Sequence, residues 1–289
     1  MTDPRGDPVT SMGKTVRLAR IVPGVRTVMV PFDDDLINGP YAGLADPVAR
    51  AREVALGGAD AILGFPRLLT QCTERGIRLP FVANLTASTV LGVHTRKVAV
   101  SSVERAVGNG CDGVAVHVNV SDRQEPDMLS TLGAVAEDCE RWGMPLLAIM
   151  YPRRTHNGAD DNYLELKDHE RARYADLVRH CVRIAVELGA DMVKTQYTGD
   201  PESFASVTTA SMGVPVIVAG GPRTSIREAL TNAHGAITAG ATGVCFGRQT
   251  YNRPDIPGFV GMLRAVVHDG RAPDDVLADR PGIPATSAQ

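Results

Sequence analysis

One lysine interrupts a short apolar run in the second half of the chain. Residues 191 to 197 read DMVKTQY, with Lys194 directly after Asp-Met-Val. Lysine is among the residues least often fully buried, and apolar surroundings lower the pKa of its amine. An amine of this kind is a candidate nucleophile. The alternative is that Lys194 lies at the end of a strand and simply reaches water.

The chemistry open to a neutral lysine is imine formation. Its amine attacks a ketone, and the protonated imine then helps the neighbouring carbon to lose a proton or to break a carbon–carbon bond. We therefore expect a lowered pKa for Lys194 and a general acid or base beside it. Asp33 and Tyr151 are the candidates. The alternatives are a solvated acidic turn or a helix cap at 33–35, and for Tyr151 a strand that merely ends at Pro152.

Glycines after two further apolar runs predict a phosphate site. In VAGGPRTS, Gly220 and Gly221 precede a Thr-Ser pair at 224–225, and in FGR, Gly247 precedes Arg248. Backbone N–H groups approach phosphate oxygens closely where no side chain intervenes, and Arg binds phosphate through two parallel hydrogen bonds. The alternative is that these glycines only permit a tight turn from strand to helix.

Two more polar residues follow apolar runs and are candidates for substrate binding. They are His117, in AVHVN, and Arg153, in YPRR. A core histidine with satisfied hydrogen bonds is the alternative for His117, and Asn119 is interpreted as a turn residue. No metal site is expected, because the seven histidines show no HExxH or comparable pairing.

The bulk composition excludes several classes of partner. With 30 basic and 33 acidic residues the net charge is −3, and no basic stripe indicates nucleic-acid binding. No secretory leader and no apolar run of about 18 residues is present, so we expect a cytoplasmic protein without a membrane partner. The cysteines show no CxxC spacing and are interpreted as reduced packing residues. They are Cys72, Cys111, Cys139, Cys181 and Cys245.

A repeated phrase predicts the elements that position these residues. A glycine, a small residue, a polar residue and a short apolar run recur at 57–65, 110–118, 189–197 and 240–248. A helix that ends on a left-handed glycine, followed by a strand buried on both faces, gives this pattern. Further apolar runs bring the number of candidate strands to eight. They are residues 27–31, 79–85, 145–151 and 214–220.

Amphipathic segments between these strands predict helices, for example at 46–58, 171–190 and 225–241. Alternating strands and helices favour an α/β fold with a closed parallel sheet, a (β/α)8 TIM barrel, over a doubly wound open sheet. No G-x-G-x-x-G follows the first strand, which argues against dinucleotide binding. One catalytic barrel domain is expected over 16–270, with a flexible N-terminal tail at 1–15 and a peripheral or disordered C-terminal tail at 271–289.

A barrel carries its active site at the carboxyl ends of its strands. Lys194, Asp33 and Tyr151 all stand at such ends in the predicted order of strands. Their shared position at one rim favours the catalytic interpretation of Lys194 over that of a stray surface lysine.

At these residues the chain resembles the archaeal-type class I aldolases, a DeoC/fructose-bisphosphate-aldolase-like group. The similarity extends over about 13–270, and its most specific segments point to the branch of 2-amino-3,7-dideoxy-D-threo-hept-6-ulosonate synthase and the related 2-amino-4,5-dihydroxy-6-oxo-7-(phosphooxy)heptanoate synthase. These segments are HVNV (117–120), WGMPLLAIMYPR (142–153) and VKTQYTGD (193–200).

The resemblance implies roles for three residues: Lys194 as the Schiff-base lysine, Tyr151 as the acid/base tyrosine and Asp33 as the proton-shuttling carboxylate. It implies a covalent imine without a cofactor, and a homo-oligomer. The implied reaction condenses a ketose-phosphate or dihydroxyacetone-phosphate-type donor with a small aldehyde, L-aspartate semialdehyde above all, to a seven-carbon amino keto acid. Three alternatives stay open: a fructose-bisphosphate aldolase, a thiolase-type acyl transfer from a phosphorylated diketone to coenzyme A, and a non-catalytic metabolite-binding barrel.

The chain departs from the family pattern at the mouth of the predicted barrel. The family usually reads aspartate-histidine-glycine after the first strand, where this chain has Asp33, Asp34 and Asp35. Asn84 stands where relatives often have histidine. Additional negative charge disfavours a phosphorylated ligand unless cations offset it.

Overall fold

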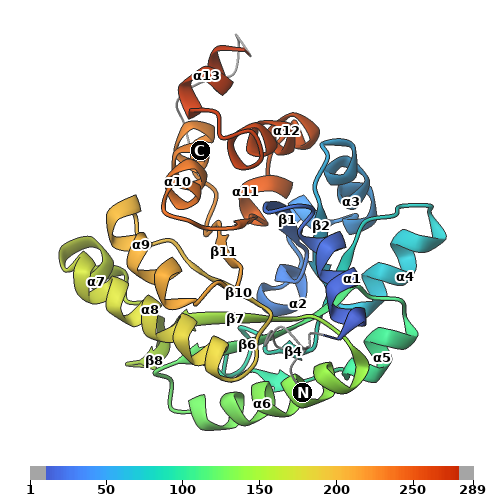
Figure 1. Ribbon diagram of the computed structural model, residues 1–289, viewed down its shortest axis with the longest axis vertical. Helices are drawn as coiled ribbons and strands as arrows, with labels where there is room; N and C mark the ends of the chain where they lie inside the picture. Colours follow the sequence, from blue (N-terminus) through green and yellow to red (C-terminus); the bar gives the residue numbers. More distant parts are fainter. Residues whose placement is uncertain (1–10, 280–289) are drawn as a thin grey trace, which may run out of the picture.

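Eight short parallel strands close into a barrel within residues 11–279, which the computed structural model describes (Figure 1). They pair in the order β1-β12-β11-β10-β7-β6-β3-β2, and β1 also pairs with β2, which closes the ring. The predicted (β/α)8 barrel is confirmed, and the open sheet is excluded. The barrel strands are β1 (Thr27–Pro31), β2 (Ala61–Gly64), β3 (Phe81–Asn84), β6 (Gly113–Val120), β7 (Leu146–Pro152), β10 (Met192–Gln196), β11 (Val216–Ala219) and β12 (Gly243–Cys245).

Each of the eight apolar runs identified in the sequence overlaps one of these strands. Every residue of β1, β2 and β3 is buried, because one face of each strand fills the barrel and the other lies under the outer helices. Short runs of Val, Ile, Leu and Ala meet that requirement. The predicted strands are therefore confirmed, with small shifts at their ends.

Helices surround the barrel (Figure 1). The three predicted amphipathic helices are confirmed as α3 (Pro47–Leu56), α8 (Arg171–Glu187) and α10 (Ile226–Thr238). α3 begins at Pro47 because the Asp46 carboxylate accepts hydrogen bonds from the first backbone N–H groups. The other helical segments are α1 (Met12–Ile21), α2 (Asp34–Asn38), η1 (Ala42–Leu44), α4 (Pro66–Glu74), α5 (Val103–Gly108), α6 (Glu125–Trp142), α7 (Leu164–His169), α9 (Pro201–Ala210), α11 (Arg248–Tyr251), α12 (Ile256–Val267) and α13 (Pro273–Ala278).

Two helices lie where the sequence predicted tails. α1 begins within the predicted N-terminal tail, and α13 lies within the predicted C-terminal tail, where Val276 is buried. Helical structure therefore extends beyond the predicted limits of 16 and 270. The outer parts of both predicted tails, 1–10 and 280–289, lie outside the described residues.

The amino-terminal end of the barrel is closed by α1. Ile21 and Val22, at the end of that helix, pack with the residues that fill the barrel interior, among them Met29 and Val82. The hydroxyl of Thr27 donates a hydrogen bond of 2.7 Å to the Ile21 carbonyl and fixes the entry into β1. With this end closed by apolar side chains, polar groups have access to the interior only from the carboxyl end.

Two small antiparallel pairs of strands stand at the carboxyl end of the barrel. β4 (Thr86–Ala87) pairs with β5 (Val98–Ala99) after β3, and β8 (Arg154–His156) pairs with β9 (Ala159–Asp161) after β7. The β8–β9 turn is Asn157-Gly158, and both residues have positive φ, as a two-residue hairpin turn requires. These pairs raise the wall around the barrel mouth. No helix in residues 11–279 is long and apolar enough to span a bilayer.

Candidate active site

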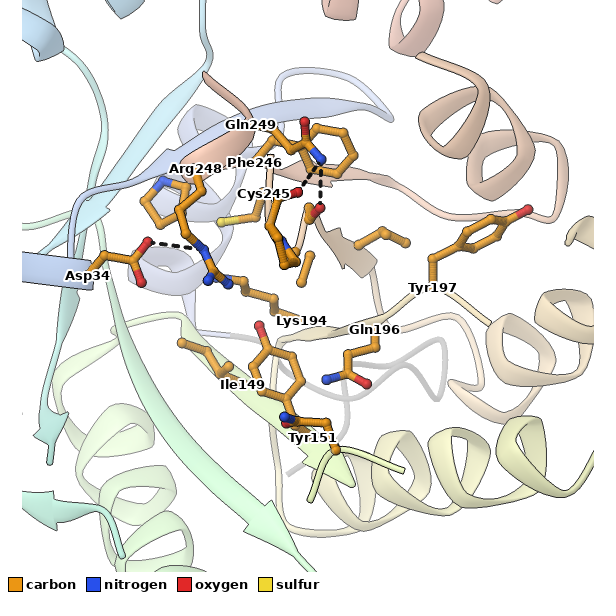
Figure 2. Close-up of a pocket in the computed structure, with 18 of the residues that line it drawn as sticks. Asp34, Ile149, Tyr151, Lys194, Gln196, Tyr197, Cys245, Phe246, Arg248 and Gln249 are labelled. Carbon is orange, nitrogen blue, oxygen red and sulfur yellow. Dashed lines mark hydrogen bonds and ion pairs between the residues drawn. The ribbon is translucent and has the colours of Figure 1, made fainter. Parts of the chain in front are cut away.

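A cavity of about 510 Å³ opens at the carboxyl ends of the strands. All nine residues proposed from the sequence as site residues line it, and Figure 2 shows Lys194, Tyr151 and Arg248 converging on one space. The fold thus brings together side chains that lie far apart in the sequence. The nine are Asp33, His117, Tyr151, Arg153, Lys194, Gly220, Gly221, Gly247 and Arg248.

Lys194 lies on β10 and is only 6% exposed. Burial acts to lower its pKa, but the charges that Cys245, Tyr151 and Asp33 carry when ionised act against this, so the pKa is raised. The lowered pKa predicted from the sequence is therefore wrong, because residues from β12, β7 and the β1 end surround the amine. Burial also raises the pKa of Cys245 to about 11 and that of Tyr151. Of the three groups around the amine, Asp33 is the one with the lowest ordinary pKa, so it is the group best suited to balance the ammonium.

Asp33 follows β1 and is buried beside the cavity. It occupies the N-cap position of α2, yet its side chain accepts no capping hydrogen bond. Oδ2 instead accepts a 2.9 Å hydrogen bond from Nδ2 of Asn84 at the end of β3. Burial raises the pKa of Asp33, while Lys194 and the Asn84 hydrogen bond oppose that rise. The carboxyl group is consequently poised to take or give a proton at the bottom of the cavity.

Tyr151 stands on β7, the strand beside β10. The His117 ring meets its ring edge-on, with centroids 5.0 Å apart, and the Arg153 guanidinium lies 5.5 Å from the ring centroid. These contacts hold the phenol in place from two sides. Burial raises the pKa of Tyr151, so the hydroxyl keeps its proton near neutral pH.

For His117 the sequence left two alternatives, a substrate-binding residue and a core histidine with satisfied hydrogen bonds, and the structure shows features of both. Its side chain is buried, and Nε2 lies 3.1 Å from Oδ1 of Asn119, yet the ring also lines the cavity. Burial and the positive charges of Lys97 and Arg153 lower its pKa well below the ordinary value. His117 is therefore a neutral part of the wall. Asn119 is no turn residue, because it lies buried within β6.

The glycines after β11 and β12 stand in tightly packed backbone. A Cβ on Gly220 would lie 2.8 Å from Cδ1 of Phe246, and one on Gly247 would lie 2.9 Å from Cγ of Pro31. Gly221 has a φ of +65°, which favours glycine. Packing and backbone conformation thus require all three glycines, and their loops expose main chain to the cavity.

One residue that the sequence did not reveal holds the first glycine loop in place. Nε2 of the buried Gln249, which is labelled in Figure 2, donates hydrogen bonds to the carbonyl oxygens of Gly220 and Pro222. α10 then begins after Ser225, whose hydroxyl accepts a hydrogen bond from the Glu228 N–H. The predicted helix start after the glycine pair is confirmed.

The acidic run after β1 is partly neutralised by its neighbours. Asp34 accepts a hydrogen bond from the Tyr251 hydroxyl and lies 3.8 Å from Nε of Arg248. Asp35 points elsewhere and accepts a 3.0 Å hydrogen bond from the Tyr41 N–H. Arg248 therefore enters the cavity next to one carboxylate, and an incoming anion must share it with Asp34.

The cavity wall contains further ionisable residues that the sequence did not single out. His94 and Lys97 come from the loop between β3 and α5, and Asp160 comes from the β8–β9 hairpin. His94 and Lys97 lie between β4 and β5, and Asp160 lies within β9; the apolar pattern does not report the pairing of these short strands. The Asn-Gly pair at 157–158 was the available signal for the hairpin.

Metal ligands and disulfides play no visible part in the described chain. Residues 11–279 contain no group of three or more His, Cys, Asp or Glu side chains placed to hold a metal ion. All five cysteines are buried and free. Burial raises the pKa of the thiols for which a shift is seen, for example Cys72 to about 11, which suits packing residues rather than nucleophiles.

Known proteins resemble this chain over most of its length. The model of the DeoC/LacD family of aldolases matches residues 27–253. A 2-amino-3,7-dideoxy-D-threo-hept-6-ulosonate synthase of Halobacterium salinarum is 38% identical over 271 residues, which cover 93% of this chain and 97% of that protein. A 2-amino-4,5-dihydroxy-6-oxo-7-(phosphonooxy)heptanoate synthase of Streptomyces griseus is 37% identical over 249 residues, covering 84% and 85%.

A solved structure shows the same architecture. It is an archaeal fructose-1,6-bisphosphate aldolase with its catalytic lysine covalently bound to the carbinolamine intermediate of the substrate. The TM-score is 0.78 at 26% identity, and the match covers 88% of this chain and 99% of that one.

Proposed function

Since the chain belongs to the DeoC/LacD family of aldolases, we propose that it is a Schiff-base aldolase that joins a dihydroxyacetone-phosphate-type donor to L-aspartate semialdehyde. One observation carries the proposal. A buried lysine, a buried carboxyl group and a buried phenol, Lys194, Asp33 and Tyr151, line the same cavity as two glycine loops with an arginine. This set contains an amine nucleophile, two proton carriers and an anion site.

The first step needs a neutral amine, and Asp33 supplies the means to form it. Transfer of one proton from the Lys194 ammonium to the Asp33 carboxylate removes two buried charges at once. The raised pKa of Lys194 means that the pair does not lose this proton to solvent, and the raised pKa of Asp33 favours transfer of the proton to its carboxylate. The amine then attacks the donor ketone carbon, and the ketone oxygen leaves as water to give an iminium.

The second stage forms the carbon–carbon bond. Loss of a proton from the donor carbon next to the iminium gives an enamine, whose carbon attacks the aldehyde carbon of the acceptor. The aldehyde oxygen takes a proton, and water releases the product from Lys194. Tyr151 holds its proton near neutral pH and touches the space that Lys194 faces (Figure 2). It serves as the base that takes the proton from the donor carbon and as the acid that protonates the aldehyde oxygen.

The donor phosphate fits the glycine loops. Gly220, Gly221 and Gly247 bring backbone close to the cavity, and Arg248 adds a positive charge. Loops in the same place, after the last two barrel strands, bind phosphate in many TIM barrels. The nearby Asp34 carboxylate competes for Arg248 and weakens this site. At 3.8 Å that contact is long, so the Arg248 guanidinium can turn towards the doubly charged phosphate of the donor.

The names of both curated relatives support the choice of acceptor, and the name of the Streptomyces griseus protein supports the choice of donor. Each describes a seven-carbon product with a 2-amino group. In the product named for the Streptomyces griseus protein, the hydroxyl on carbon 5, the oxo group on carbon 6 and the phosphonooxy group on carbon 7 correspond to dihydroxyacetone phosphate. The remaining four carbons, with their acid and 2-amino groups, correspond to aspartate semialdehyde.

Product analysis tests this assignment. The protein is incubated with dihydroxyacetone phosphate and an equal mixture of L-aspartate semialdehyde and D-glyceraldehyde 3-phosphate, and the products are resolved by mass. We expect the seven-carbon amino keto acid phosphate to dominate. Fructose 1,6-bisphosphate as the main product would instead favour a fructose-bisphosphate aldolase, the activity named for the similar archaeal structure.

Self-association remains part of the proposal. The loop after β4 exposes several apolar side chains, of which Leu91 is 95% and Val93 62% exposed. Exposed apolar side chains on one loop favour an association surface. Light scattering of the purified protein tests for a homo-oligomer, and a monomeric mass would contradict it.

A further inference from the structure

Two cations stand in the cavity wall across the barrel from the glycine loops. Arg153 follows β7, and Lys97 lies on the loop after β3, which Asn119 of β6 ties down through a 2.7 Å hydrogen bond from Nδ2 to the Thr95 carbonyl. β7, β6 and β3 are consecutive in the ring, whereas the glycine loops follow β11 and β12 on the other side. The cavity therefore has a second pair of cations, carried by other strands than the glycine loops. Burial lowers the pKa of Arg153, and Arg248 is near enough for its charge to lower that pKa further.

In residues 11–279, neither Lys97 nor Arg153 forms an ion pair with a carboxylate, although the charge of Asp160 acts on both. Nζ of Lys97 donates a 2.6 Å hydrogen bond to the Ser88 hydroxyl, and Arg153 contacts the Asn162 side-chain oxygen and Nε2 of His94. Lys97 is only 3% exposed, and burial and the charge of Arg153 lower its pKa to about 8. An anion placed between them would relieve that repulsion.

Another buried lysine of the chain, Lys14, has the carboxylate partners that Lys97 lacks among the described residues. Lys14 in α1 is 2% exposed, much like Lys97, but its Nζ contacts both Asp191 at 3.1 Å and Glu140. Its pKa is raised, because these contacts outweigh burial. Lys97 is buried to the same extent without such partners, so packing alone does not explain it.

His94 adds an unused hydrogen-bond donor to this end of the cavity. Arg153 can only donate, so Nε2 of His94, 3.1 Å from Nη1, accepts, and the ring proton lies on Nδ1. Burial lowers the pKa of His94 to about 4, which keeps the ring neutral. Nδ1 is buried and has no partner among the described residues. Buried donors are rarely left unpaired, so this nitrogen marks a polar position next to the cavity that no described protein group satisfies.

We propose that Lys97 and Arg153 bind the carboxylate of the acceptor aldehyde and that Asp160 binds its ammonium group. Asp160 lines the same cavity, and its carboxylate lies 3.5 Å from Nε2 of His94. Two cations and one carboxylate match an α-amino acid head group, which carries one negative and one positive charge. This subsite rests on the proposed aldol function and assigns named residues to the two charges of the acceptor.

An acceptor series tests the subsite with dihydroxyacetone phosphate as donor. L-Aspartate semialdehyde carries both charges, succinic semialdehyde carries the carboxylate alone, and propanal carries neither. In Lys97→Met, we expect KM for both carboxylates to rise roughly 10- to 100-fold, as the loss of a charged hydrogen bond implies, with an at least tenfold smaller effect on propanal. Lys97→Arg keeps the charge and should restore the preference for carboxylates.

Two further variants complete the design. Asp160→Asn should reduce the preference for aspartate semialdehyde over succinic semialdehyde and leave the preference for succinic semialdehyde over propanal. The matched control is Arg96→Met, at the residue next to Lys97 in the sequence. It also removes a positive charge, but the Arg96 side chain is exposed and lies 3.8 Å from the Asp127 carboxylate. This control should keep the wild-type order of acceptors.

The outcomes separate the subsite from the aldolase proposal. Borohydride trapping of the wild-type protein with donor alone reports imine formation without any acceptor, so its absence would overturn the aldolase function itself. If the imine forms but Lys97→Met changes KM for all three acceptors equally, or for none, the carboxylate subsite is wrong. The same conclusion follows if Lys97→Arg behaves like Lys97→Met.

Discussion

The side-chain amide of Asn84 donates a hydrogen bond of 2.9 Å to Oδ2 of Asp33, and both residues are buried. This bond joins the ends of β3 and β1 beneath the cavity. It stabilises the charged carboxylate and so limits the rise that burial imposes on the Asp33 pKa.

Removal of this amide should move the acidic limb of the pH–rate profile. In Asn84→Ala the Asp33 carboxylate loses a donor, so its pKa rises further and it stays protonated to higher pH. The acidic limb of kcat/KM should therefore move to higher pH, and at a fixed pH on that limb kcat/KM should fall by roughly tenfold. Asn38→Ala is the matched control, because Asn38 donates to Asp34 instead. An unmoved limb in Asn84→Ala would remove Asp33 from the proton-transfer step.

Tyr151→Phe should slow turnover and spare the imine. The variant keeps the ring that packs against His117 and Arg153 but loses the hydroxyl that exchanges protons. We expect kcat to fall by roughly 10²- to 10⁴-fold, as is usual for a lost general acid. The control is Tyr163→Phe, whose hydroxyl bonds with Ser121 outside the cavity. Full turnover in Tyr151→Phe would assign the proton transfer to another group.

Asp34→Asn should strengthen the phosphate site. Its carboxylate lies 3.8 Å from Nε of Arg248 and competes with a ligand phosphate for that cation. Neutralising it should lower KM for dihydroxyacetone phosphate by about three- to tenfold and make inorganic phosphate a better inhibitor. Asp35→Asn, which removes an equal charge from a side chain bonded to the Tyr41 N–H, should have less effect. Equal effects of the two variants would indicate general charge rather than the Arg248 contact.

Gly220→Ala should weaken donor binding through packing. Its Cβ would lie 2.8 Å from Phe246 Cδ1 and 3.0 Å from Cγ of Gln249, so the loop must shift. We expect a destabilisation of about 1–3 kcal/mol and a higher KM for dihydroxyacetone phosphate. Gly133→Ala in α6 is the control: a Cβ there meets nothing within 4 Å, so it should stabilise the helix by about 0.5–1 kcal/mol. Thermal unfolding and steady-state kinetics on both variants check these expectations.

The barrel could be predicted because its strands carry a local signature. Residues 27–31 coincide with β1 throughout, since a strand buried on both faces leaves a continuous apolar run. The parallel topology then places every residue that follows a strand at one rim, which is why Asp33, Tyr151 and Lys194 could be grouped without coordinates. Strand-end residues are predictable where topology alone decides their position.

Residues on long loops could not be placed in this way. Lys97 and His94 reach the cavity because the loop after β3 folds back over β6, and Thr95 is held there by Asn119, a contact between distant parts of the chain. The hairpin that brings Asp160 to the cavity had only its Asn-Gly turn as a signal. Tertiary contacts, not local pattern, fix these side chains.

The direction of the shift in the Lys194 pKa also could not be predicted from the sequence. Burial alone predicts a lowered value, and burial is what the apolar run around Lys194 indicated. Asp33 and Cys245, which lie far from Lys194 along the chain on either side, reverse that outcome when the barrel closes. Charge balance inside the barrel depends on which strands become neighbours.

The most direct test of the account asks which lysine carries the substrate. Three lysines line the cavity, Lys97, Lys167 and Lys194, and burial lowers the pKa of the first two. The protein is incubated with dihydroxyacetone phosphate, reduced with borohydride and digested, and each lysine peptide is weighed. The account predicts a mass gain on Lys194, retained in Lys167→Met and lost in Lys194→Met. A gain on Lys97 or Lys167, or no gain on the folded protein, would contradict it.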